Sequence, residues 1–454
     1  MCSDLCILLN KGFYVKPCND KPYHLNYTCE TRVLSASVIG WGQSKQLDNS
    51  LSQFYQWFVG FCDAEASFLL QPVLSSENTI RKVTWIFSIE LHKDDLGVLE
   101  YIRNNLGIGN IRLYKDKCIY VVTNIEGTHQ LISIFDKYNL NSTKYLDYCK
   151  YKEAFLLYQE KDKKLTDLQY KIELANKIVE LKNTMNTKRV NTTMPLDHNI
   201  VITKSWLLGY LEGDSSFFIS RTDIEPVFTL AATEEQCLLF EKIKEFLMEN
   251  LGFDKYSLFK LKCTQIISIN KVKAREIGKP SIILTIKNIR LLNNYFIPYF
   301  EDIVFISKKG LDFQDFKLIV QAVYKGSHKT DEIRSLILKL SYTMNNFRLS
   351  TCERLTEALS VKERDIITNA APLLEYLSDG RIRDLSNNSI LTTTTSCVYE
   401  MVTPEGTCKI LDSLKDVLSE VGVGFRTLKK QLDLYERAEV KGYTIKRISV
   451  FSKK

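Results

Sequence analysis

Two short stretches decide the fold of this chain: QWFVGFCDAEASF at residues 56–68 and SWLLGYLEGDSSF at residues 205–217. A tryptophan, a glycine, two acidic positions and a phenylalanine recur in both stretches in the same order. The second stretch follows the first by 149 residues, which is the offset from Glu65 to Asp214 and the length of an ordinary domain. The sequence therefore predicts two copies of one structural unit.

Further landmarks repeat downstream of both stretches, and they do so in one order. The pairs are FSIELHKDDLGVLEYI at 87–102 with FTLAATEEQCLLFEKI at 228–243, TNI at 123–125 with KNI at 287–289, KYLDY at 144–148 with KGLDF at 309–313, and MNTKR at 185–189 with MNNFR at 344–348. Because an ordered series of matches seldom arises by chance, we interpret the chain as a duplicated domain.

Each copy has the pattern of an αββαββα unit, so the expected fold class is α+β. Apolar residues at helical spacing place each acidic stretch on a helix, and partial alternation marks strands with one covered face. The remaining expected elements are strands at 67–74, 82–92, 109–115 and 118–123 and helices at 95–106 and from 126 in the first copy, and strands at 216–221, 226–232, 257–270 and 281–286 and helices at 234–250 and from 289 in the second.

The rest of the chain divides by composition. Residues 397–454 predict a small module with a hairpin, a helix capped by Ser413, a glycine turn and a basic helix. That outline is typical of a helix-turn-helix. The expected parts are an N-terminal extension at 1–50, a first domain at 51–182, a polar linker at 183–204, a second domain at 205–350, a connector at 351–396 and this module.

Composition narrows the class of protein. Apolar residues make up 45% of the chain and charged residues 25%, which excludes a wholly disordered or collagen-like chain. No apolar run reaches the roughly 18 residues that a membrane span needs, so we expect no membrane partner.

The chain has 61 Lys and Arg residues against 54 Asp and Glu, a net charge of +7 that suits a polyanionic partner. The 12 cysteines form no CxxC pair and predict reduced thiols.

Small residues four apart line one face of each acidic helix: Gly60 and Ala64, and Gly209 and Gly213. Such faces allow two helix backbones to approach closely, which would bring Glu65 and Asp214 together. Two adjacent carboxylates repel each other unless a cation lies between them, and Mg²⁺ suits carboxylate oxygens and phosphates. The pattern favours metal-assisted phosphodiester hydrolysis. The alternative is that Glu65 and Asp214 are N-caps or exposed acids beside a buried helix. Asp63 and Glu212 also recur, and we expect a structural role for them, in capping or in contacts between the domains.

The motifs FVGFCDAEA and LLGYLEGDS resemble those of double-motif LAGLIDADG homing endonucleases and intron maturases encoded in organelles. The resemblance covers about residues 53–350. It implies a saddle of two sheets on duplex DNA, divalent metal held by Glu65 and Asp214 with the carbonyls of Ala64 and Gly213, and basic residues Lys144 and Lys309 near the cleaved phosphates. The tail resembles modular DNA-binding domains found on nucleases. Ala66 and Ser215 depart from the glycine that usually occupies the ninth position of each motif.

The resemblance leads us to expect a site-specific double-stranded DNA endonuclease that promotes intron mobility in a mitochondrion, as a monomer with two pseudo-symmetric halves. Open sheet faces and the basic helix of the tail would contact DNA. The alternatives are a maturase that binds its own group I intron RNA and a protein that only binds DNA. The candidate DNA-binding residues are His92, Arg112, Lys115, Arg221, Lys260, Lys262, Arg426, Lys429 and Lys430.

Overall fold

The computed structural model describes residues 41–160, 167–274, 278–353, 357–391, 395–435 and 437–452. Most of the expected N-terminal extension therefore lies outside the described residues. The remainder of the chain, Ser50–Lys454, forms one compact unit. None of the described helices is long and apolar enough to cross a lipid bilayer.

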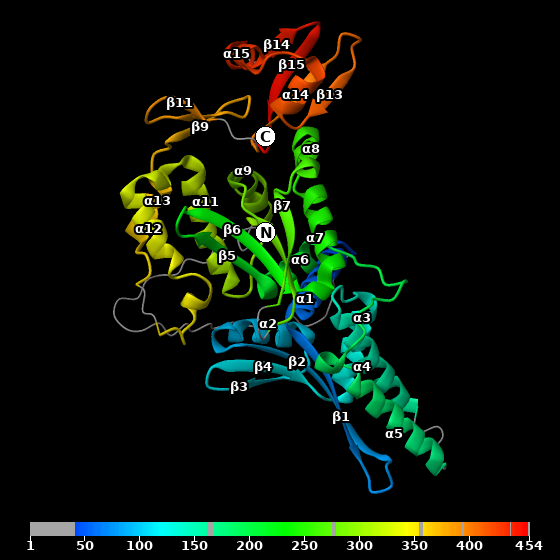
Figure 1. Cartoon of the computed structure of the whole chain (residues 1–454). Coiled ribbons are helices and arrows are strands. Elements are labelled where there is room, and N and C mark those ends of the chain that lie inside the picture. The colour runs from blue at the N-terminus through cyan, green and yellow to red at the C-terminus, as the bar shows by residue number, and fades with distance from the viewer. Residues whose placement is uncertain are drawn as a thin grey trace. The chain divides into compact units, whose positions relative to one another are not determined.

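The first repeat begins with the helix that carries the first acidic motif and continues into a four-stranded antiparallel sheet (Figure 1). The strand order is β1-β2-β4-β3. Its elements are α1 (Trp41–Glu65), β1 (Ala66–Leu74), β2 (Ile80–His92), a 3₁₀ turn (Lys93–Asp95), α2 (Leu96–Leu106), β3 (Asn110–Leu113), β4 (Lys117–Val122), α3 (Ile125–Lys137), α4 (Lys144–Gln159) and α5 (Leu168–Asn183).

The second repeat has the same plan, and its sheet order β5-β6-β8-β7 matches that of the first. This identity of order confirms the predicted αββαββα duplication. Its elements are α6 (Lys204–Asp214), β5 (Ser215–Ser220), β6 (Glu225–Thr233), a 3₁₀ turn (Glu234–Gln236), α7 (Cys237–Asn250), α8 (Lys255–Cys263), β7 (Ile267–Val272), β8 (Ser281–Ile286), a helical stretch from α9 (Ile289–Leu291) to α10 (Ile297–Phe300), α11 (Lys309–Lys325) and α12 (Asp331–Ser341).

One strand prediction is partly wrong. Residues 257–270 were expected to form a single strand, but their first half belongs to the helix α8, and only β7 is extended. The Asp254 side chain accepts the backbone N–H of Ser257 at 2.7 Å and caps this helix at its start. Because Asp is a strong N-cap residue, the helix begins where alternation alone suggested a strand.

Alternate side chains of each repeat's sheet build the core. Trp85, Phe87 and Ile89 of β2 are buried, whereas the residues between them are partly open. Helices cover the buried face, and the other face stays open, as the partial alternation predicted. Phe217 and Phe228 play the same part in the second repeat, where their rings lie 5.4 Å apart.

The C-terminal region contains more structure than expected. The expected connector at 351–396 holds a helix, α13 (Val361–Asn369), and also an unpredicted three-stranded sheet of β9 (Leu374–Tyr376), β10 (Ile382–Asp384) and β11 (Ser389–Leu391). The tail forms a sheet of order β13-β12-β15-β14 with two helices, and its predicted hairpin and Ser413 cap are present. Its elements are β12 (Cys397–Val402), β13 (Cys408–Leu411), α14 (Leu414–Val421), α15 (Phe425–Tyr435), β14 (Arg437–Val440) and β15 (Tyr443–Ser449).

Candidate functional site

The two motif helices α1 and α6 pack backbone against backbone at their glycines. A methyl group added at Gly60 would lie 2.0 Å from the Trp206 carbonyl oxygen, and one added at Gly209 would lie 2.0 Å from the Trp57 carbonyl oxygen. A methyl group at Gly213 would meet the Ala64 side chain and would lie 3.1 Å from Glu65 Oε1. The small residues therefore form the contact between the repeats, as the spacing predicted.

This packing brings Glu65 and Asp214 into one partly buried acidic centre. Burial is the main cause that raises the pKa of Asp214 to about 7, and the nearby charge of Glu65 raises it further. Burial likewise raises the pKa of Glu65, against the lowering effect of Lys144 and Lys309. Two carboxylates held this way favour a proton or a cation between them.

Two lysines enter the same centre, one from each repeat. Lys144 Nζ, at the start of α4, donates to the Ala64 carbonyl at 2.5 Å, so the carbonyl expected to face a metal has a lysine beside it. Lys309 Nζ, at the start of α11, donates to the Ser215 carbonyl at 2.6 Å. Burial lowers the pKa of both lysines, and Glu65 and Asp214 oppose that effect.

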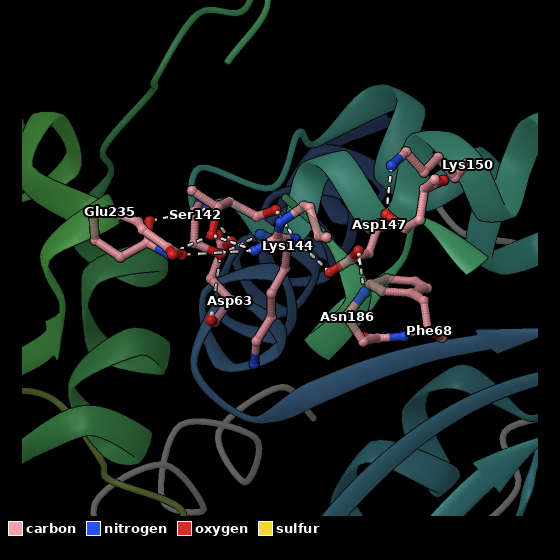
Figure 2. A network of polar contacts seen from close by, with 12 residues as sticks. Asp63, Phe68, Ser142, Lys144, Asp147, Lys150, Asn186 and Glu235 are labelled. Carbon is pink, nitrogen blue, oxygen red and sulfur yellow. Dashed lines mark hydrogen bonds and ion pairs between the residues drawn. The ribbon is translucent and has the colours of Figure 1, made fainter. Parts of the chain in front are cut away.

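The inner acids of the motifs are structural, as expected, and they join the repeats. Asp63 accepts the backbone N–H groups of Asn141 and Ser142 at 2.8 Å each, just before α4, and Figure 2 shows Asp63 beside Ser142. Asp63 also accepts Trp206 Nε1 of the other repeat at 2.9 Å. In this way a side chain on α1 fixes both the start of the lysine-bearing helix and the neighbouring motif helix.

Glu212 repeats the arrangement on the other side. It accepts the N–H groups of Ile306 and Ser307 just before α11 and Trp57 Nε1 of the first repeat at 3.0 Å. Burial raises the pKa of Glu212, while these donors lower it. A buried carboxylate needs such donors. These bonds therefore explain why each motif carries a second, inner acid.

The MNxxR landmarks tie the lysine-bearing helices to the first strand of each sheet. Asn186 donates its backbone N–H to Asp147 at 2.8 Å and its side-chain N–H to the Phe68 carbonyl at 2.8 Å (Figure 2). Arg189 pairs with Asp147 at 2.5 Å. Asn345 and Arg348 make the matching bonds to Asp312 in the second repeat, so these motifs are structural.

A cleft of about 660 Å³ opens beside the acidic centre, and residues of both repeats line it. Glu65, Lys309, His92 and Arg221 are among them. His92 Nε2 lies 3.0 Å from the Thr351 hydroxyl, and Arg221 stacks on Tyr342 with 4.2 Å between the guanidinium carbon and the ring centroid. His92 and Arg221, both predicted to bind DNA, thus line the cleft, where each side chain already contacts another residue of the protein.

The other predicted DNA-binding residues fall into three places. Arg112 is exposed on β3, directly opposite Ile119 on the open face of the first sheet, and Lys115 is exposed in the turn that follows. Lys262 is exposed on α8 rather than on a strand. Arg426, Lys429 and Lys430 are all exposed on α15.

Lys260 contradicts its predicted role. Its side chain is buried, and Nζ forms an ion pair with Asp412 at 2.7 Å. The prediction was wrong because it placed Lys260 on an open sheet face, whereas α8 turns this side chain toward the C-terminal module. Phe451 is buried against the same repeat, where its N–H donates to the Ser257 hydroxyl at 3.0 Å. The module is therefore anchored on the second repeat.

Sequence reasoning missed Asp95, which lines the cleft and acts electrostatically on both Glu65 and Lys309. A difference between the repeats could have indicated it, because the matching position in the second repeat is Gln236. Among the described residues no two cysteines form a disulfide.

Two duplicated α+β units that share one acidic centre define a class of single-chain proteins with internal pseudo-twofold symmetry. The family model described as "LAGLIDADG endonuclease" matches residues 58–155 and 207–320, one segment in each repeat. Both repeats of the chain thus match the LAGLIDADG endonuclease family, as the resemblance of its motifs indicated.

Similar proteins are fungal. "Probable intron-encoded endonuclease Cox1-I1b" of Schizosaccharomyces pombe is 32% identical over 43% of this chain and 50% of its own length. "Uncharacterized mitochondrial protein RF1" of Saccharomyces cerevisiae is 25% identical over 66% of this chain and 61% of its own length. "Probable intron-encoded endonuclease 3" of Neurospora crassa is 25% identical over 66% of this chain and 59% of its own length. The chain thus spans only half to three fifths of these relatives.

Solved structures share the fold of the two repeats. The meganuclease I-SmaMI bound to uncleavable DNA is 26% identical, with a TM-score of 0.54 over 65% of this chain and 98% of that one. The LAGLIDADG homing endonuclease I-GzeII in complex with its DNA target is 22% identical, with a TM-score of 0.53 over 64% and 99%. The C-terminal region accounts for most of the remaining part of this chain.

Proposed function

We propose that this protein is a site-specific double-stranded DNA endonuclease that hydrolyses phosphodiester bonds with a divalent cation. The observation that carries the proposal is the meeting of Glu65 and Asp214, one from each repeat, beside Lys144 and Lys309 at the end of the paired helices. One acid and one lysine per repeat give two similar half-centres, which suits a substrate that itself has two antiparallel strands.

The acidic pair fits a hard cation such as Mg²⁺, because burial raises the pKa of both carboxyl groups and the charge of Glu65 raises the pKa of Asp214 further. Among the described residues no three His, Cys, Asp or Glu side chains gather at a metal-binding distance. The ligands would therefore be these two carboxylates together with the carbonyls of Ala64 and Gly213 and water. A bound cation would supply an acidified water and stabilise charge on the phosphate.

The protein's own side chains would divide the remaining work. Lys144 and Lys309 hold positive charge where a phosphate would lie, and this charge is worth more in a partly buried centre than in water. Asp63 and Glu212 keep the helices of these lysines in place through backbone bonds. Side chains held in place in this way supply preorganised charge, which is what electrostatic catalysis requires.

DNA would lie on the open faces of the two sheets, with phosphate contacts setting affinity and base contacts setting specificity. Arg112 and Lys115 are exposed in the first repeat, and the cleft residues His92 and Arg221 lie nearer the acids. Lys262 on α8 remains a candidate for a flanking phosphate.

The basic face of α15 would contact DNA beyond the half-site of the second repeat, since its module is anchored there. Changing Arg426, Lys429 and Lys430 together to alanine is expected to weaken binding to all sequences. Each lost phosphate contact lowers the salt dependence, so the slope of log K against log salt should fall by about 2–3. An unchanged slope would remove α15 from the interface.

The names of the relatives support a mitochondrial, intron-encoded protein. We further propose that it acts as a monomer and promotes the mobility of its intron. The intron-less allele of its host gene is then the expected substrate. An RNA-binding maturase role stays a prediction, and splicing of the host intron with and without the protein would test it.

The test is a cutting assay on plasmids that carry intron-less fungal mitochondrial genes, with Mg²⁺ present. Glu65→Gln and Asp214→Asn should each abolish double-strand cutting, while gel-shift affinity for the same DNA in Ca²⁺ stays within about threefold. Glu126→Gln, a change of an exposed acid in the first turn of α3, serves as the matched control and should cut normally. Cutting by either centre variant at the wild-type rate would refute the proposal.

A further inference from the structure

Asp95 makes a bond that crosses from the first repeat to the second. It ends the 3₁₀ turn Lys93–Asp95, and its Oδ1 accepts the backbone N–H of Lys308 at 2.9 Å. Lys308 is the N-cap residue of α11, and its own side chain makes no capping bond. The first turn of the helix that carries Lys309 therefore receives this bond from the opposite repeat.

Gln236 makes the mirror-image bond. It ends the 3₁₀ turn Glu234–Gln236, and its Oε1 accepts the backbone N–H of Thr143 at 3.1 Å while Nε2 donates to the Thr143 hydroxyl at 2.7 Å. Thr143 is the N-cap residue of α4, which carries Lys144, and it too makes no capping bond with its own side chain.

Helix starts leave backbone N–H groups without partners inside the helix, and a side chain that accepts one of them fixes the first turn. Asp63 and Glu212 satisfy the donors just before α4 and α11 from within their own repeats. The backbone N–H of the N-cap residue itself is accepted by a side chain of the other repeat, Gln236 for α4 and Asp95 for α11. Each lysine is thus held from both sides.

We propose that Asp95 and Gln236 are positioning residues, each of which fixes the helix start of the opposite repeat and hence the lysine at that start, Lys309 for Asp95 and Lys144 for Gln236. Every half-centre then depends on both repeats, so damage to one turn misplaces the lysine of the opposite repeat rather than the lysine of its own repeat. The two positions differ in charge: Asp95 adds a carboxylate beside Lys309, whereas Gln236 adds none beside Lys144. The mechanistic consequence rests on the proposed nuclease function, but the positioning itself does not.

Hydrogen–deuterium exchange of the full-length protein tests the positioning without any cutting. Asp95→Ala should speed exchange in residues 308–313 by about five- to tenfold, the effect of one lost capping bond, and leave residues 143–148 unchanged. Gln236→Ala should speed exchange in residues 143–148 and leave residues 308–313 unchanged. Asp95→Asn keeps an oxygen acceptor and should restore slow exchange. Equal acceleration of both segments, or of neither, would overturn the proposal.

Strand-resolved cutting tests the consequence. With the two strands of the target labelled separately, Asp95→Ala and Gln236→Ala should each slow one cut by about tenfold, and the slowed strands should be opposite ones. Slowing of the same strand by both variants would contradict crosswise control. If the wild-type protein cuts no DNA while the exchange pattern is as expected, the proposed function fails and the positioning stands.

Discussion

The contact between α1 and α6 predicts a large penalty for one added methyl group. In Gly60→Ala the new Cβ would lie 2.0 Å from the Trp206 carbonyl oxygen, whereas ordinary contact begins at 3.4 Å, so the helices must separate by up to about 1.4 Å. Because both partners are backbone, neither can turn aside. Overpacking of this kind costs about 3 kcal/mol, and the better helix propensity of alanine returns at most about 1 kcal/mol.

The expected net destabilisation of Gly60→Ala is therefore about 2 kcal/mol, measured as a lower midpoint in urea unfolding at unchanged slope. Gly97→Ala is the matched control, since Gly97 also lies in a helix but has no atom within 4 Å of its added Cβ. That control should be stabilised by about 0.5–1 kcal/mol. Separation of the helices also shifts Glu65 against Asp214, so cutting should fall by about a hundredfold. Equal midpoints for the two variants would refute the packing argument.

Three further predictions concern stability. Since the pKa of Asp214 is raised to about 7, the folded protein keeps a proton that the unfolded chain releases near pH 4, and stability falls as the pH rises from about 4 to 7. Asp214→Asn should remove that fall in a thermal-midpoint series across this range. Asn345 has a φ of 54°, so Asn345→Ala should lose about 1 kcal/mol more in urea unfolding than Asn345→Gly, which tolerates this backbone. Asp379→Ala removes one of the two carboxylates that pair with the buried Arg447 at 3.0 Å and leaves only Asp433, so it should destabilise the C-terminal module by about 2 kcal/mol, seen as faster proteolysis within residues 397–452.

The duplication made much of this fold predictable from sequence. Each motif, strand pair and MNxxR closing occurs twice, so a weak signal in one repeat was supported by the other. The contact between the motif helices was predictable for the same reason. Gly60 and Gly209 occupy equivalent positions, and a close backbone contact explains why both are glycine.

Prediction failed where the repeats differ. The segment before β7 has a helical insertion, α8, without a counterpart at the matching place in the first repeat, and Lys260 was consequently placed on a strand. The sheet of β9 to β11 lies outside the duplication and uses strands of three residues, too short for an alternation signal. Asp95 and Gln236 were missed because their bonds join residues far apart in the sequence.

The central claim is that one acid from each repeat meets the other in a single centre. Titration of the Asp214 carboxyl by ¹³C NMR, with aspartate selectively labelled, tests this claim most directly. The charge of Glu65 is one of the causes that raise the pKa of Asp214 to about 7, so Glu65→Gln should lower it measurably. A pKa of Asp214 that is the same in the wild type and in Glu65→Gln would contradict a shared centre.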